Sequence, residues 1–478
     1  MSSRKDAVAA YSHTVRRLRS GMLHGDPDVL DPGSGRTWRG LLGGIVLALV
    51  VGAIVAVIGL VKPGGGDGWR VAGTLVVVED TGARYLYADG ALHPVLNETS
   101  ARLLAGKNLR VDTVTAGDLR GAEQGAPLGI VGAPDAAPDA ASLERGTWLA
   151  CAVNATAAAG TDSTRLVARI GDSGVPGTGL TVGRGVLVRT ADARTYLVWS
   201  GRRLAVDAEA QAALGWAGAA VTPVPVGFVN ALPAGPDLVA TPPAGLGRTG
   251  GTVAGSPRLV GQLFRDPGGQ GYVLTTQGMQ RVSAVRLALL RANADIQRLA
   301  YRGTPPQVID AGAGDVASAT GTPEDDAMPA TPPRLVTVPT GDSLCGVTRP
   351  RPDALVTSVT IAAQSNVLRG AVPIAAQPGV RPGCENADLV AVPPGRGTLV
   401  ATRAGTGAAG GAYLVADTGV KYPVPPAGLS RLGYSDGAAL PLPSALLRLL
   451  PTGPALDPVG LARSGVVAAP TSAATCGG

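Results

Sequence analysis

The stretch VVVEDTGARYLYADGALHPV at residues 76–95 predicts three short strands joined by two turns. Val, Leu and Tyr occupy its strand positions, and Asp89-Gly90 is a dipeptide that suits a tight hairpin turn. Three later stretches follow the same pattern, in which a tyrosine precedes a valine by 10 or 11 residues. These stretches are VLVRTADARTYLVWSGRRLAV (186–206), QLFRDPGGQGYVLTTQGMQRV (262–282) and GGAYLVADTGVKYPV (410–424).

The four stretches predict four small quasi-repeats, each with three strands and a following short helix. The helix of the first copy is expected at residues 100–105, capped by Thr99 or Ser100 and stopped by Gly106. A helix of the fourth copy is expected at residues 444–450. The copies are unevenly spaced, which excludes a solenoid of fixed period. Glycines that tolerate positive φ are expected in the second turn of each copy, at Gly90, Gly201, Gly278 and Gly419.

An uninterrupted apolar segment, LLGGIVLALVVGAIVAVIGLV at residues 41–61, precedes the copies. About 20 helical residues cross a bilayer core of about 30 Å, so this segment predicts one transmembrane helix. Basic residues concentrate before it, which predicts a cytoplasmic N-terminus and an exported C-terminal region. A cleaved signal peptide is the alternative, which the length of the segment and the lack of an A-x-A site disfavour. The basic residues are Arg4, Lys5, Arg16, Arg17, Arg19, Arg36 and Arg39 before the segment, and Lys62 and Arg70 just after it.

The N-terminal tail predicts an amphipathic helix that ends near Gly21. Its apolar stripe can rest on the anionic inner leaflet of the membrane or bind a cytoplasmic partner. A solvated basic tail is the third interpretation. The stripe consists of Val8, Tyr11, Val15, Leu18 and Met22.

Composition limits the remaining possibilities. The chain has 478 residues, and the roughly 400 after the apolar segment can form two or three domains. Aromatic residues make up only 3% of the chain, so small aliphatic residues must fill the cores, and 69 Gly and 39 Pro favour short strands and many turns. The net charge of +6 is interpreted as spread along the chain, with no basic run that predicts a nucleic-acid partner.

The four cysteines all follow the apolar segment, where an exported region would form disulfides. Three pairings are possible. We favour Cys151 with Cys345, which would close a loop of 194 residues. Cys384 and Cys476 would then form a second bridge, although Cys476 could equally be a free thiol near the C-terminus.

The expected fold class is α+β, with a β-rich exported region of four quasi-repeats around a central β domain, preceded by one transmembrane helix. Strand-like sequence at 141–180 and 335–400 is assigned to the central domain. The expected divisions are a cytoplasmic tail with an amphipathic helix (1–40), the transmembrane helix (41–61), repeat 1 (62–140), the first part of the central domain (141–180), repeat 2 (181–245), repeat 3 (246–301), a linker (302–334), the second part of the central domain (335–400), repeat 4 (401–464) and a flexible tail (465–478).

Motifs for catalysis or metal binding are missing from the sequence. No GxxxxGK[ST] P-loop, GxSxG elbow or HExxH pair is present. No CxxC or Cys/His cluster predicts a zinc site. His93 is the single histidine after the apolar segment, and we interpret it as a hydrogen-bonded structural residue. We therefore assign no catalytic, cofactor-binding or metal-binding residues.

Several segments resemble the EccB family, the B component of the type VII (ESX) secretion core complex of actinobacteria. The resemblance covers nearly the whole chain and is strongest at residues 4–151. The order of a cytoplasmic tail, one span and a large exported part is also similar. The segments are RRLRSGMLHGDPD (16–28), DTGARYLYADGALHPVLNETSARLL (80–104), LGIVGAPDAAP (128–138) and WLAC (148–151).

The resemblance implies a structural subunit in the inner membrane that assembles with itself and with EccC, EccD and EccE components, EccC being the motor ATPase. It also implies contact with the mycosin protease and a disulfide that matches Cys151–Cys345, while Cys384 and Cys476 depart from that single-bridge pattern. The family is described as having ATPase activity, so an ATP-hydrolysing exported domain is an alternative function. A cell-wall-binding module is another, because small β repeats often bind glycans.

Overall fold

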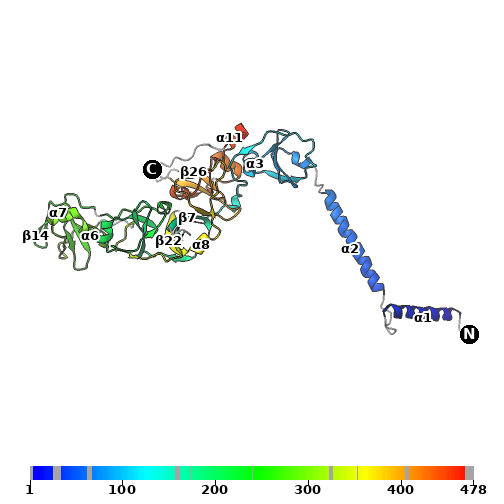
Figure 1. Ribbon diagram of the computed structural model, residues 1–478, viewed down its shortest axis with the longest axis horizontal. Helices are drawn as coiled ribbons and strands as arrows, with labels where there is room; N and C mark the ends of the chain where they lie inside the picture. The colour runs from blue at the N-terminus through cyan, green and yellow to red at the C-terminus, as the bar shows by residue number, and fades with distance from the viewer. Residues whose placement is uncertain are drawn as a thin grey trace. The chain divides into compact units, whose positions relative to one another are not determined.

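The computed structural model describes residues 4–24, 34–61, 67–156, 162–172, 174–239, 241–321, 327–351, 354–403, 409–435 and 437–468. The chain divides into two compact units (Figure 1). The first comprises Met1–Gly68 and Val114–Arg120, and the second comprises Trp69–Thr113 and Gly121–Gly478.

Two helices make up most of the first unit. Helix α1 spans Arg4–His24 and so continues past Gly21, where the sequence predicted its end. Helix α2 spans Ser34–Val61, which includes the whole apolar segment and the residues just before it. Of the helices in the described ranges, none combines the length and the apolar character that a membrane crossing requires.

A seven-stranded sheet forms the centre of the second unit. The chain builds one half of this sheet, leaves it for about 160 residues, and returns to build the other half beside β6. The pairing of β6 with β21 joins the halves, and residue 151 lies opposite residue 345 in that register. The strand order is β23 (Val372–Pro373), β24 (Leu389–Ala391), β7 (Asp162–Asp172), β6 (Thr147–Thr156), β21 (Asp342–Pro350), β22 (Leu355–Ala363) and β8 (Gly177–Gly179).

Four smaller sheets share one arrangement, and we call them modules 1 to 4. Three consecutive strands pair antiparallel, a helix follows, and a further strand lies on the other side of the first strand. This further strand is parallel to the first in modules 2, 3 and 4.

The modules are bounded as follows. Module 1 contains β1 (Thr74–Val78), β2 (Arg84–Ala88), β3 (Ala91–Pro94), α3 (Glu98–Ala105) and β4 (Arg110–Val114). Module 2 contains β9 (Arg184–Arg189), β10 (Thr195–Trp199), β11 (Arg202–Ala205), α4 (Ala208–Ala213) and β12 (Thr222–Pro223). Module 3 contains β15 (Leu263–Arg265), β16 (Gly271–Thr275), β17 (Gly278–Val282), α6 (Ala284–Ala292), α7 (Ala294–Ala300), β18 (Val308–Asp310) and β19 (Thr320–Gly321). Module 4 contains β25 (Thr398–Arg403), β26 (Ala409–Val415), β27 (Lys421–Val424), α9 (Pro426–Leu432) and β28 (Leu440–Leu442).

Shorter elements connect these sheets. The hairpin of β13 (Thr249–Val253) and β14 (Ser256–Leu259) precedes module 3, and β20 (Arg334–Leu335) pairs with β9. The other elements are the 3-10 helices η1 (Asp67–Arg70) and η2 (Ala140–Ser142), the strands β5 (Gly129–Ile130) and β29 (Val466–Val467), and the helices α5 (Val226–Ala231), α8 (Gln364–Leu368), α10 (Ser444–Leu447) and α11 (Pro458–Ser464).

The glycines expected in the second turns all have positive φ, which confirms the turn prediction. In Asp89-Gly90 the φ angles are 50° and 83°, and in Ser200-Gly201 they are 48° and 75°. Gly278 and Gly419 have φ of 108° and 77°. A Cβ on Gly201 would also lie 1.9 Å from the carbonyl oxygen of Thr357, so glycine lets the turn of module 2 approach the central sheet.

Two helix predictions were wrong in detail. Helix α3 begins earlier than expected because the side chain of Asn97, rather than that of Thr99 or Ser100, caps it by accepting from the Ser100 N–H at 2.9 Å. It ends before Gly106, as expected. In module 4 the helix after the three strands is α9, which a proline begins, and the helix expected at 444–450 is the shorter α10.

The expected linker at 302–334 contains strands. Its β18 pairs with β15, and its β19 pairs with β17, so the segment completes the sheet of module 3. Its last residue begins β20, which pairs with module 2. The Pro- and Gly-rich composition concealed these two- and three-residue strands, which have no periodicity of their own. Residues 322–326 lie outside the described ranges.

The expected flexible tail also begins with a strand. Val466–Val467 forms β29, which pairs in parallel with Gly129–Ile130 of β5. This pairing links the end of the chain to the region just after module 1. Residues 469–478 lie outside the described ranges.

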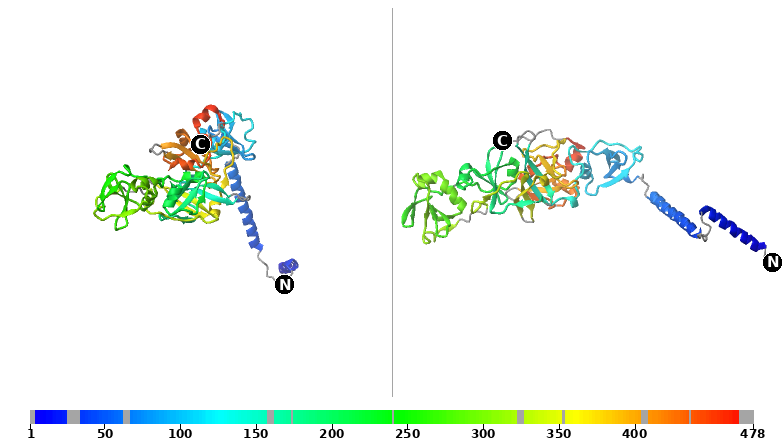
Figure 2. Two further views of the ribbon diagram at one scale, coloured as in Figure 1. Left: turned by 60° about the vertical axis from the view of Figure 1, so that its left-hand side comes forward. Right: turned by 60° about the horizontal axis from the view of Figure 1, so that its bottom comes forward.

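The modules share hydrophobic cores in pairs. Helix α3 of module 1 packs with α9 of module 4, and their common core includes Leu103, Leu414 and Tyr422 (Figures 1 and 2). Helix α4 of module 2 packs with α6 of module 3 around a core that includes Leu204 and Leu289. Each pair is therefore stabilised as one body rather than as two independent domains.

Two short helices connect the module pairs to the central sheet. Helices α5 and α10 follow modules 2 and 4 and contact each other. Phe228 of α5 and Leu446 of α10 pack in one core with Trp148, Leu166 and other residues on one face of the sheet. Modules 2 and 4 are therefore attached to the central sheet through equivalent helices.

Candidate functional site

The cysteines selected from the sequence lie in the middle of the central sheet. Cys151 of β6 and Cys345 of β21 are joined by a disulfide with an S–S distance of 2.08 Å. Both are buried, and they pack with Val153, Val167 and Val347 on the face opposite the core that contains Phe228. The disulfide therefore links the two halves of the sheet in a position that solvent does not reach.

The other two cysteines follow later in the chain. Cys384 is also disulfide-bonded. Cys476 lies outside the described residues.

His93 has a structural role, as the sequence predicted. Its Nδ1 lies 2.9 Å from the carbonyl oxygen of Ala126, and the side chain is half-buried. The ring also occupies the space beside Gly125, where an added Cβ would lie 2.2 Å from the ring. The contacts hold the segment after module 1 against β3 and leave the ring little room for a ligand.

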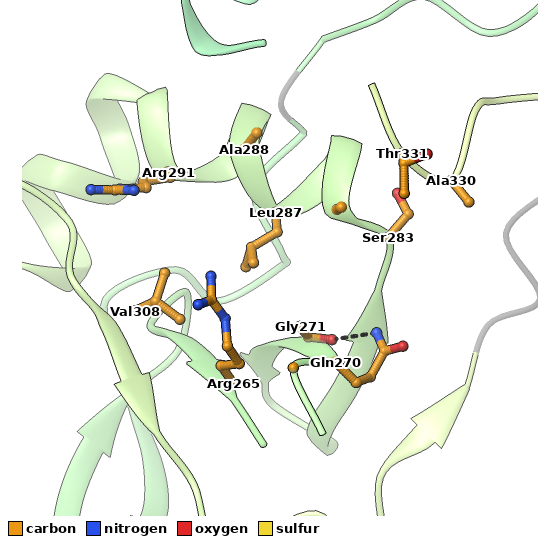
Figure 3. Close-up of a pocket in the computed structure, with 12 residues that line it drawn as sticks. Arg265, Gln270, Gly271, Ser283, Leu287, Ala288, Arg291, Val308, Ala330 and Thr331 are labelled. Carbon is orange, nitrogen blue, oxygen red and sulfur yellow. Dashed lines mark hydrogen bonds between the residues drawn. The ribbon is translucent and has the colours of Figure 1, made fainter. Parts of the chain in front are cut away.

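A cavity of about 410 Å³ lies in module 3 (Figure 3). Its walls come from the turn between β15 and β16, the first turns of α6, strand β18 and residues 330–331. Leu287, Ala288 and Val308 supply apolar surface. Arg265 reaches into the middle of the cavity toward Leu287, whereas Arg291 lies at the rim with its guanidinium directed outward.

The polar groups around the cavity are held by the surrounding fold. The side chain of Gln270 donates to the carbonyl oxygens of Gly271 and Val282 at 3.0 and 2.8 Å. The hydroxyl of Ser283 caps α6 by accepting from the Arg286 N–H at 3.1 Å. These bonds fix the rim of the cavity and make its shape preorganised.

The cavity is electropositive. Two arginines line it, and among the residues that the structure describes no aspartate, glutamate or histidine does. Within the described ranges, neither Arg265 nor Arg291 forms an ion pair or a side-chain hydrogen bond, although Asp310 lies opposite Arg265 in the strand register. The two guanidinium groups favour the binding of an anion at this cavity.

A count of charged residues along the sequence indicates the segment that contains this site. Residues 246–301 contain seven arginines, no lysine, two aspartates and no glutamate, for a net charge of +5. The interpretation that the positive charge is spread evenly along the chain was therefore wrong. The convergence of Arg265 and Arg291 on one cavity could not be predicted, because it depends on how α6 packs over β15.

Lys421 is an unusual half-buried charge in module 4. Its ammonium donates to the carbonyl oxygens of Leu447 and Leu450, each at 2.6 Å, and thereby satisfies the backbone after α10. Burial lowers the pKa of Lys421 from 10.5 to about 8. Since no carboxylate pairs with it in the described ranges, the charge is stabilised by backbone carbonyl groups alone.

We expect the free energy of unfolding to rise as the pH increases from 8 to 10. The folded protein releases the Lys421 proton near pH 8, whereas the unfolded chain retains it until about pH 10.4. The unfolded state therefore binds more protons than the folded state in this interval. The free energy of unfolding should rise by at most about 3 kcal/mol. Stabilisation of the charged form of Lys421 by the two carbonyl groups reduces this rise. Above pH 10, the raised pKa of Tyr422, about 12, gives the opposite slope.

Urea unfolding monitored by tryptophan fluorescence at a series of pH values would measure this effect. Lys421→Met should flatten the curve between pH 8 and 10 relative to the unsubstituted protein. Parallel curves for the two proteins would show that Lys421 does not titrate in this range.

Groups of three or more potential metal ligands are absent from the described ranges. The family described as "Type VII secretion system ESX-1, transport TM domain B" matches residues 1–463. The chain belongs to this family, EccB. It is a structural subunit of the type VII secretion complex.

Curated relatives also match nearly the whole chain. "ESX-3 secretion system ATPase EccB3" of Mycolicibacterium smegmatis is 30% identical over 490 residues, which cover 94% of this chain and 88% of the relative. The protein of the same name from Mycobacterium tuberculosis is also 30% identical and covers 94% of this chain and 87% of the relative.

Solved structures of the EccB family have the same fold. A structure of the EccB3 dimer from the ESX-3 core complex is 26% identical, with a TM-score of 0.63, and covers 81% of this chain and 99% of that chain. A chain of the intact ESX-5 inner membrane complex is 21% identical, with a TM-score of 0.65, and covers 96% of this chain and 95% of that chain. The mixed α and β, β-rich architecture is therefore that of the family.

Proposed function

We propose that this chain is a single-pass subunit of an inner-membrane secretion complex, with its N-terminus in the cytoplasm and its sheet-bearing unit exported. The apolar segment at 41–61 would be the membrane anchor. Its side chains support this role, because Leu47 and Leu49 of α2 are 65% and 67% exposed and would be covered by lipid or by partner helices. The family description, which names a transport TM domain, agrees with this assignment.

The exported unit would act as a scaffold. The observation that carries this proposal is the sharing of cores between modules 1 and 4, between modules 2 and 3, and between both pairs and the central sheet. Such packing produces a body whose surfaces keep a defined relative position, as a structural subunit requires. We propose that the four modules are copies of one unit, since they share strand order and turn positions.

The proposed partners are further copies of this chain and the other core components. Self-association is supported by the EccB3 dimer of the ESX-3 core complex. EccC-, EccD- and EccE-like components and a mycosin protease are proposed from the family resemblance. Relatives are named ATPases, and we do not extend that name to this chain because its sequence has no P-loop.

Cysteine labelling of intact cells tests the topology. Ser12→Cys in α1 and Gln277→Cys in the β16–β17 turn each place a thiol at an exposed position. A membrane-impermeant maleimide should label Gln277→Cys in intact cells and Ser12→Cys only after permeabilisation. The opposite pattern would reject the proposed orientation.

Deletion of the chain tests the scaffold role. Complexes purified from cells without it should lack the dimeric exported assembly, and secretion should stop. A complex of normal composition and normal secretion in its absence would contradict the proposal.

A further inference from the structure

We propose that the cavity of module 3 binds an acidic, extended segment of a protein partner, with a carboxylate of that segment held by Arg265 and supported by Arg291. The inference goes beyond the scaffold role because it assigns a ligand chemistry to one module. It depends on the geometry of module 3 and holds whichever side of the membrane this module occupies.

The positive charge of the cavity favours an anionic ligand. The guanidinium of Arg265 lies in the cavity without a carboxylate partner in the described ranges, and Arg291 adds a second positive charge at the rim. A guanidinium presents two parallel N–H groups that match the geometry of a carboxylate. Residues 246–321 contain eight arginines and four aspartates, a net charge of +4 that would attract an acidic partner before contact.

Apolar surface beside the arginines distinguishes a peptide from a simple ion. Leu287 is buried and lies beside the guanidinium of Arg265, and Ala288 and Val308 line the same cavity. A highly hydrated polyanion would gain nothing from these side chains, whereas a peptide can place the methylene groups of a glutamate or an adjacent aliphatic side chain against them.

Strand β18 supplies a backbone edge beside the cavity. It is the last strand of its sheet, and within the described ranges only β15 pairs with it. The Ala311 N–H donates to the Arg265 carbonyl at 2.8 Å, so the backbone groups of Ala311 and Ile309 face β15. The backbone groups of Val308 and Asp310 alternate with them and face away from the sheet. An extended peptide can pair with such an edge, and every second side chain would then face the cavity.

A binding experiment with the purified full-length chain in detergent tests this proposal. The probe is a fluorescent peptide that alternates glutamate and valine, compared with a peptide that alternates glutamine and valine and with a short polyphosphate. Anisotropy at about 0.15 M salt, where long-range attraction is screened, should show binding of the glutamate peptide only.

Substitutions locate the binding site. Arg265→Gln should weaken binding by about tenfold, the effect of losing a charge-assisted hydrogen bond, and Arg291→Gln should weaken it less. Arg281→Gln is the matched control, because Arg281 is exposed on β17 of the same module and does not line the cavity. The affinity of the Arg281→Gln protein for the glutamate peptide should change by less than about twofold.

Hydrogen exchange gives an independent readout of strand addition. The bound peptide should slow amide exchange in the segment that contains β18, in the unsubstituted protein but not in Arg265→Gln. Three results would each overturn the proposal: no binding of the glutamate peptide, equal losses from Arg281→Gln and Arg265→Gln, or preferential binding of polyphosphate. The last result would identify a general polyanion surface instead of a peptide site.

Discussion

Replacing both Cys151 and Cys345 with alanine is expected to lower the free energy of unfolding by about 5 kcal/mol, because the bridge closes a loop of 194 residues. That loop contains modules 2 and 3, whose folding brings β21 back beside β6. Without the bridge, the unfolded chain gains the freedom to separate the two halves of the central sheet, so closing the loop again costs more entropy. Alanine is chosen because a serine hydroxyl at either buried position would lack a partner.

Urea unfolding followed by fluorescence would measure the change, since Trp148 is buried in β6 close to the bridge. The control is the same comparison in a reducing agent, where the unsubstituted protein loses its bridge and the difference should nearly vanish. A full difference that persists under reducing conditions would mean that packing of the sulfur atoms, rather than loop closure, stabilises the sheet.

Phe228→Ala is expected to destabilise the exported unit by about 3–5 kcal/mol, the usual range for removing a fully buried phenylalanine. Phe228 lies in α5 and is 0% exposed. It packs in the core that joins the central sheet to modules 2 and 4, including Leu446 of α10. The substitution would leave a cavity where these three parts meet, so we expect earlier urea unfolding of both the central sheet and module 2.

Val226→Ala is the matched control because it lies in the same helix but is 42% exposed. It should cost less than about 1 kcal/mol. Similar losses from the two substitutions would contradict the assignment of this stability to the buried core, because alanine is the better helix former at both positions.

Local sequence patterns predict many elements of the fold correctly. The alternation of Val, Leu and Tyr located the three antiparallel strands of each module, and the turn glycines were found at positive φ. Gly106 ended α3 as expected, and His93 proved to be a hydrogen-bonded structural residue. Each of these features depends on residues close together in the chain, where conformational preference and spacing carry the information.

Features that depend on contacts with distant parts of the chain were not predicted from the sequence. The strands β18, β19 and β29 have only two or three residues, and each exists because another part of the chain offers an edge. The N-cap of α3 was predicted at Thr99 or Ser100, whereas the carboxamide of Asn97 caps the helix. All three residues are suitable caps, and only the path of the chain selects one.

The sequence by itself determined family membership, the strand and turn pattern of the four modules, and the apolar segment at 41–61, since local residue order encodes all three. Only the tertiary structure decided which modules share a core, how α5 and α10 join them to the central sheet, and that Arg265 and Arg291 both line one cavity. Those arrangements arise from packing between segments far apart in the chain, and side-chain volume and register at each contact select one partner from several that the local pattern allows.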